Sequence, residues 1–125
     1  AAAAAALQRG DFLQAFLYVH ALVESLLRLF LRVPDDSDVS FAKLVGKYQA
    51  FLNREQYPIH TFVDELVKFN QRRNRMVHQL WSHGYTHTNR AAETAASAAV
   101  MMYGLLIEWL ETFDDEITTI GFDYE

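Results

Sequence analysis

The chain has 125 residues, which suits one domain and is too short for most two-domain enzymes. Hydrophobic residues make up 51% and charged residues 22%, close to the averages of soluble globular proteins, so the composition excludes an intrinsically disordered chain. The absence of cysteine excludes disulfides, thiolate metal sites and cysteine nucleophiles. Five Gly and two Pro are too few turn residues for a multi-stranded sheet, which excludes an all-β fold.

The net charge of −5 is unevenly distributed along the chain. No acidic residue lies between Leu66 and Ala92, and no Lys or Arg follows Arg90. This pattern predicts either two solvated helix faces of opposite sign or a basic site for a phosphate-bearing partner. The residues of that basic site are Lys68, Arg72, Arg75 and Arg90.

The first six residues are all alanine, and we treat this run as a placeholder and not as a targeting sequence. The predicted single domain therefore covers residues 7–125. No signal-peptide pattern is visible, and the fully apolar runs are far shorter than the ~18 residues of a membrane span. We therefore expect a cytoplasmic protein with no membrane partner.

The first predicted helix covers residues 7–33, because apolar residues recur there at alternating steps of four and three until Pro34. Arg28 repeats the same spacing on the opposite side, so we expect it on the solvent face. A second helix is predicted over residues 41–53. It ends near Pro58, because the residue before a proline disfavours helical geometry.

The third predicted helix covers residues 62–81. Thr61 and Asp64 resemble a capping box at its start, and Gly84 is its expected terminator.

A fourth helix is predicted over residues 91–115, with a continuation to Ile120 left open. Thr88 or Asn89 is its expected N-cap. Amphipathic helices joined by short connections predict an all-α fold, an antiparallel bundle of four and at most five helices.

Arg73 is the most informative residue of the third helix. At about 100° per residue it points into the middle of an apolar cluster, whereas Lys68, Arg72 and Arg75 project to the far side. An arginine on an apolar face is costly unless it meets a carboxylate, a carbonyl or a ligand anion. A structural ion pair with Glu24 of the first helix is one explanation.

Polar residues border the same face. Asn70, Asn74 and His78 stand four residues apart and form a ladder along its edge. His20 is expected to be a core-edge histidine with a satisfied hydrogen bond. His83 and His87 have the spacing of helical metal ligands, but Gly84 between them favours a turn.

The segment Arg73-Asn74-Arg75-Met76-Val77-His78 resembles the Arg-x4-His motif of the HEPN superfamily, the higher eukaryote and prokaryote nucleotide-binding domains. The order of helices is also similar over most of the chain. The resemblance implies a HEPN-like helical bundle that forms a homodimer with facing motifs, and in many members a metal-independent endoribonuclease without cofactors. It implies that Arg73 and His78 are catalytic, that Asn74 assists them, and that Glu24 and Asn70 are supporting polar residues.

These residue types suit RNA cleavage by the 2′-hydroxyl. Histidine can transfer a proton near neutral pH, and arginine can hold the phosphate. Arg73 and His78 point about 140° apart on a straight helix, so one copy cannot easily aim both at one phosphate, whereas a symmetric dimer can. RNA would then be the partner of the basic site.

The leading interpretation is a toxin or defence ribonuclease, for which an antitoxin protein is a possible partner. Some toxin relatives carry a Tyr two residues after the His that is modified by a partner enzyme, and this chain has Leu80 there. Two alternatives stay open: a catalytically silent HEPN-like bundle that binds a nucleotide or a protein, and a purely structural bundle. No metal site is predicted.

Overall fold

The computed structural model describes residues 2–57 and 60–117, and over that part of the chain it contains six helices and no strand. The helices are α1 (Ala2–Gln8), α2 (Phe12–Leu31), α3 (Phe41–Arg54), α4 (Val63–His83), α5 (Tyr85–Ala91) and α6 (Glu93–Glu111). The predicted all-α helical bundle is therefore confirmed. Pro58, Ile120 and the acidic residues after position 117 lie outside the described residues.

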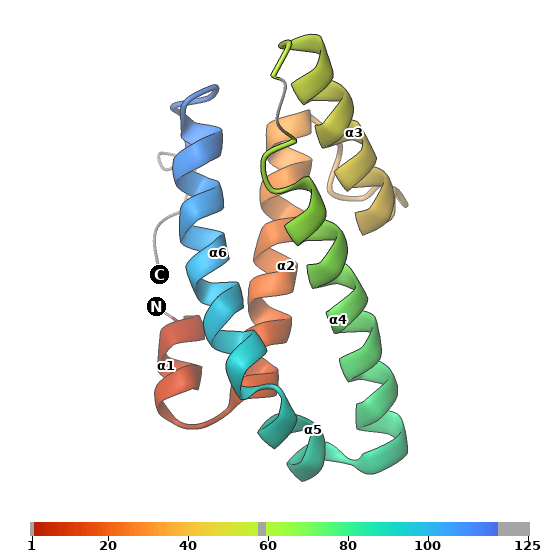
Figure 1. Cartoon of the computed structure of the whole chain (residues 1–125), viewed down its shortest axis with the longest axis vertical. Helices are drawn as coiled ribbons and strands as arrows, with labels where there is room; N and C mark the ends of the chain where they lie inside the picture. The colour runs from red at the N-terminus through yellow and green to blue at the C-terminus, as the bar shows by residue number, and fades with distance from the viewer. Residues whose placement is uncertain (1, 58–59, 118–125) are drawn as a thin grey trace.

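Helix α2 is the centre of the bundle (Figure 1). All the other helices contact it, and it lies between α6 on one side and α3 and α4 on the other. Its buried apolar residues include Phe16, Val23 and Leu26, none of which has exposed surface. The apolar residues of α2 are therefore covered from several directions.

The contacts at the two ends of α2 define its direction relative to α6. Near the start of α2, the Leu13 amide donates to Oδ1 of Asn89 (2.9 Å), a residue that lies just before the start of α6. Arg32, just after the end of α2, places its Nη2 3.2 Å from Oδ2 of Asp114, a residue that lies just after the end of α6. Helices α2 and α6 therefore run in the same direction, and α4 runs opposite to both (Figure 1).

The predicted first helix is in fact two helices. Gly10 has a φ of 79°, a left-handed conformation that interrupts the helix between α1 and α2. Residues 2–6, which the predicted domain left out, are helical, and Ala3 and Ala6 are buried in the common core.

The two predicted N-caps are wrong. Thr61 and Asp64 form no capping box, since α4 starts after Phe62, whose φ is 69° and whose side chain makes no cap. Asn89 lies inside α5, where its amide donates to the Gly10 carbonyl (2.8 Å) and holds the α1–α2 turn. The predicted last helix corresponds to α6, which starts at Glu93, and the short helix α5 before it was not predicted.

Arg28 is buried, with 7% of its surface exposed, and not on the solvent face as predicted. The connection between α2 and α3 folds over it. Its Nη1 donates to Pro34 O (3.1 Å) and Ser37 Oγ (2.8 Å), and its Nη2 donates to Val39 O (2.6 Å). These bonds satisfy the buried guanidinium and fix the path of the chain into α3.

Helix α2 is also the one helix in the described part of the chain that is long and apolar enough to cross a membrane by length and composition. It has 20 residues, and half of its most apolar window is buried inside the bundle. A core helix of a soluble protein has this character, as does a signal sequence near an N-terminus.

Candidate functional site

One side of the C-terminal half of α4 is uncovered. We call it the open face; its exposed residues are Arg73, Asn74, Val77, His78 and Trp81. Helix α3 lies beside only the start of α4 (Figure 1), since it begins at Phe41, whose ring lies 6.2 Å from that of Phe69. The next turn of α4 therefore has no neighbour on this side.

Arg73 is exposed and does not point into a packed cluster as predicted. The apolar side of α4 is covered up to Phe69, and Arg73 lies one turn beyond the start of α3. Its Nη1 donates to Oδ1 of Asn74 (3.2 Å). The ion pair with Glu24, which was one explanation for Arg73, is absent among the described contacts, and the Glu24 carboxylate lies 3.5 Å from Arg28 Nε instead.

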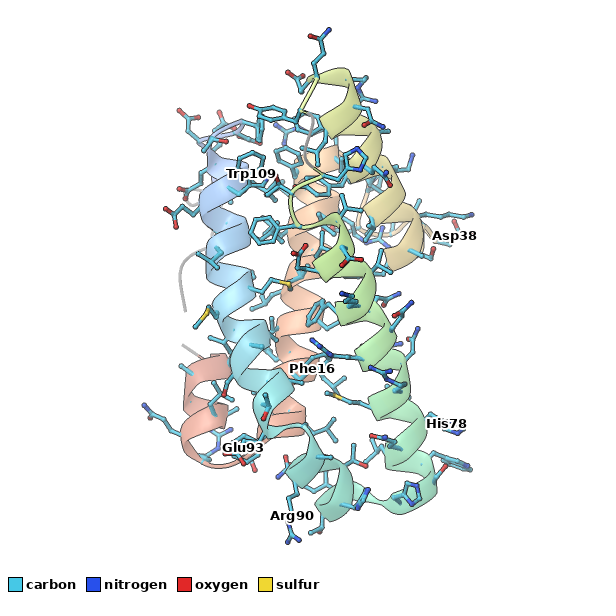
Figure 2. The ribbon with its side chains drawn as sticks, in the orientation of Figure 1. Phe16, Asp38, His78, Arg90, Glu93 and Trp109 are labelled. Carbon is cyan, nitrogen blue, oxygen red and sulfur yellow. The ribbon has the colours of Figure 1, made fainter. Side chains whose placement is uncertain are left out.

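His78, which the polar ladder placed at the edge of the apolar face, is exposed on α4. Figure 2 shows its side chain on the outer side of α4, directed away from the bundle. On a straight helix it lies about 7.5 Å along the axis from Arg73 and about 140° around it.

Asn70 is half-buried at the inner end of the ladder and connects α4 with α2. Its Oδ1 lies 3.1 Å from Nε2 of His20, which is 7% exposed. The imidazole of His20 also stacks on Phe41, with ring centroids 4.5 Å apart. The prediction that His20 is a core-edge histidine with a satisfied hydrogen bond is confirmed.

The environment of His20 holds its ring neutral near pH 7. Burial lowers the pKa of His20 below its ordinary value of 6.5. The Asn70 hydrogen bond and the Glu24 carboxylate oppose this shift, whereas the Arg73 guanidinium lowers the pKa further. Its contact with Asn70, one turn before Arg73 and Asn74, places His20 behind the start of the open face.

Three of the four basic residues expected to bind phosphates lie on the opposite side of α4. Arg72 and Arg75 are exposed and border a groove between α4 and α6, made of two adjoining cavities of about 420 and 240 Å³. Lys68 lines the second cavity and forms an ion pair with Asp64 (2.9 Å). Arg90 is exposed on α5 and does not line either cavity. The structure thus separates the motif from this groove.

Apolar residues next to the motif were not predicted as part of a site. Trp81 is 90% exposed, and Val77 is 42% exposed. Tyr18 and Tyr85 line an apolar pocket of about 560 Å³ together with Leu80, the neighbour of Trp81. The spacing in the sequence could have indicated this apolar surface, since Trp81 lies one turn after Val77 of the motif. However, periodicity alone assigns Val77 to the core.

Comparison of the chain with protein-family models, with curated proteins and with solved structures finds no match.

We predict that His20 makes folding pH-dependent. The unfolded chain takes up a proton on this histidine near pH 6.5, whereas the folded protein takes it up only at a lower pH, because its pKa is lower. The contribution of His20 to the free energy of unfolding is therefore fully present above pH 6.5 and is lost as the pH falls through the lower folded pKa. His20→Gln keeps a donor for Asn70 and should flatten this dependence. Urea unfolding at pH 7.5, 6.5 and 5.5 measures it, and identical pH slopes for both proteins would contradict the prediction.

Proposed function

We propose that this protein is a metal-independent endoribonuclease of the HEPN type that acts as a homodimer. The observation that carries the proposal is the exposure of Arg73, Asn74 and His78 together on the open face of α4. An arginine, an amide and an imidazole that line a solvent-accessible surface are available to a substrate. Glu24, the carboxylate that could have neutralised Arg73, is paired with Arg28.

The proposed reaction needs only these side chains. The ribose 2′-oxygen attacks the adjacent phosphorus, the bond from phosphorus to the 5′-oxygen breaks, and a 2′,3′-cyclic phosphate and a 5′-hydroxyl result. His78 either takes the proton from the 2′-hydroxyl or gives one to the leaving 5′-oxygen, and water exchanges the other proton. Arg73 binds the phosphate and offsets the charge on its oxygens, and Asn74 holds the guanidinium through the 3.2 Å hydrogen bond.

A second copy completes the site in this proposal. Arg73 and His78 diverge along one helix, so a phosphate held by Arg73 of one copy is better placed for His78 of the other. Tyr18, Trp81 and Tyr85 expose 43, 90 and 48% of their surfaces. Together they offer roughly 300–450 Å² per copy, a substantial share of the about 1,200–2,000 Å² that a stable interface buries in total.

The groove between α4 and α6 would bind the RNA backbone away from the reacting phosphate. Arg72 and Arg75 supply the positive charge there, in a chain whose net charge is −5, whereas Lys68 is paired with Asp64 and Glu65 also lines the groove. Such an enzyme would act in the cytoplasm as a toxin or defence component, and an antitoxin protein would restrain it.

The first test is RNA cleavage in the presence of EDTA. We expect the wild-type protein to leave cyclic phosphate ends, and Arg73→Ala and His78→Ala to abolish cleavage. Because both side chains are exposed, each substitution should change stability by about 1 kcal/mol or less and the melting temperature by only a few degrees. Arg54→Ala, at an exposed arginine on α3, is the matched control. A stable His78→Ala protein that still cleaves would contradict the assignment.

The second test concerns assembly. Trp81→Ser removes the largest exposed apolar side chain beside the motif, so it should shift the protein from dimer to monomer in light scattering at micromolar concentration. Met101→Ser is the control, because Met101 is 69% exposed on α6, away from the open face. A monomeric wild type, or a Trp81→Ser protein that stays dimeric, would argue against this interface.

The third test separates RNA binding from cleavage. Arg72→Ala combined with Arg75→Ala should weaken binding and raise KM while kcat is retained, since both residues lie across α4 from the motif. Fluorescence anisotropy with a single-stranded RNA in the His78→Ala background should show a salt slope reduced by about 1–2. An unchanged slope would remove the groove from the proposal.

A further inference from the structure

Two exposed histidines face each other where α4 turns into α5. His83 is the last residue of α4, and His87 lies in α5, beyond Gly84. Gly84, with a φ of 83°, breaks the helix, yet the turn still brings the two imidazole rings to a centroid distance of 5.0 Å. The sequence spacing alone did not predict this, because a glycine between two helical ligands normally separates them.

The distance matches that of two imidazoles on one metal ion. With a metal–nitrogen distance of about 2.0–2.1 Å and tetrahedral angles, the centroids of two ligating rings lie about 5 Å apart. The observed planes are inclined by 51°, so the rings are not stacked face to face. Both side chains are exposed, so their rings have room to rotate and to direct one nitrogen of each toward a shared ion.

The ring nitrogens have no competing partners in the described part of the chain. Apart from their mutual contact, neither His83 nor His87 has a hydrogen bond or an ion pair with another described residue. No group of three or more His, Cys, Asp or Glu forms a metal site among the described residues either. Water would therefore fill the remaining coordination positions, which is the character of an open, exchangeable site and not of a closed structural one.

We propose that His83 and His87 bind one divalent transition-metal ion, of the class of Cu²⁺, Ni²⁺ and Zn²⁺, and so clamp the turn between α4 and α5. Imidazole ligands favour these ions, whereas Mg²⁺ and Ca²⁺ require oxygen ligands. The site lies outside the proposed catalytic groups, and cleavage does not use the metal. Its effect is on the fold, because α5 carries Asn89, which holds the start of α2.

The experiment is a titration of tag-free protein with Ni²⁺ in a calorimeter, with the melting temperature measured in parallel. We expect one ion per chain, a melting temperature that rises with Ni²⁺ concentration, and no response to Mg²⁺. His83→Gln and His87→Gln should each weaken binding about tenfold or more, because each leaves a single ligand.

His60→Gln is the matched control. His60 is also exposed, but its ring nitrogens already contact Gln49 (3.2 Å) and Asn53 (3.1 Å), so its substitution should leave Ni²⁺ affinity unchanged. Absence of binding by the wild type, unchanged affinity in the His83 and His87 variants, or equal loss in the His60 variant would overturn the proposal. RNA cleavage is scored separately in EDTA, so its failure would count against the proposed function and not against the metal site.

Discussion

Burial of α2 is the constraint on which the rest of the structure depends. Its apolar arc is too broad for one neighbour to cover, so α6 packs on one side and α3 and α4 on the other. Each fully buried residue such as Phe16 or Leu26 contributes about 1.5–3 kcal/mol relative to exposure. The places of the other helices follow from this requirement, and each is then held by a few directional hydrogen bonds.

Periodicity and local stop signals were sufficient for α3 and α4, whose observed limits lie within about two residues of the predicted ones. Both are continuous amphipathic helices, and Gly84 ends α4 as expected. The same reasoning failed at Gly10, because apolar spacing continued across it and concealed a left-handed residue. All faces of a polyalanine helix have the same hydrophobicity, so nothing in the sequence indicated that Ala3 and Ala6 would be buried.

The candidate site was only partly predictable for a related reason. A helical wheel gives the direction of a side chain from its own axis, but it does not say whether another element lies there. Arg73 was assigned to an apolar face that no helix covers at that level, whereas Arg28 was assigned to solvent and is enclosed by the following connection. The partner of His20 likewise required the relative placement of α2 and α4.

Arg28 links the connection between α2 and α3 to the accessibility of the motif. Through its hydrogen bonds to Pro34, Ser37 and Val39, Arg28 fixes the path of the connection, and with it the level along α4 at which α3 begins at Phe41. A start one turn earlier would lengthen α3 by about 5.4 Å and place a helix over Arg73. The length of this connection therefore decides whether the third and fourth turns of α4 are covered by α3 or exposed to solvent. The residues of the motif itself need not change.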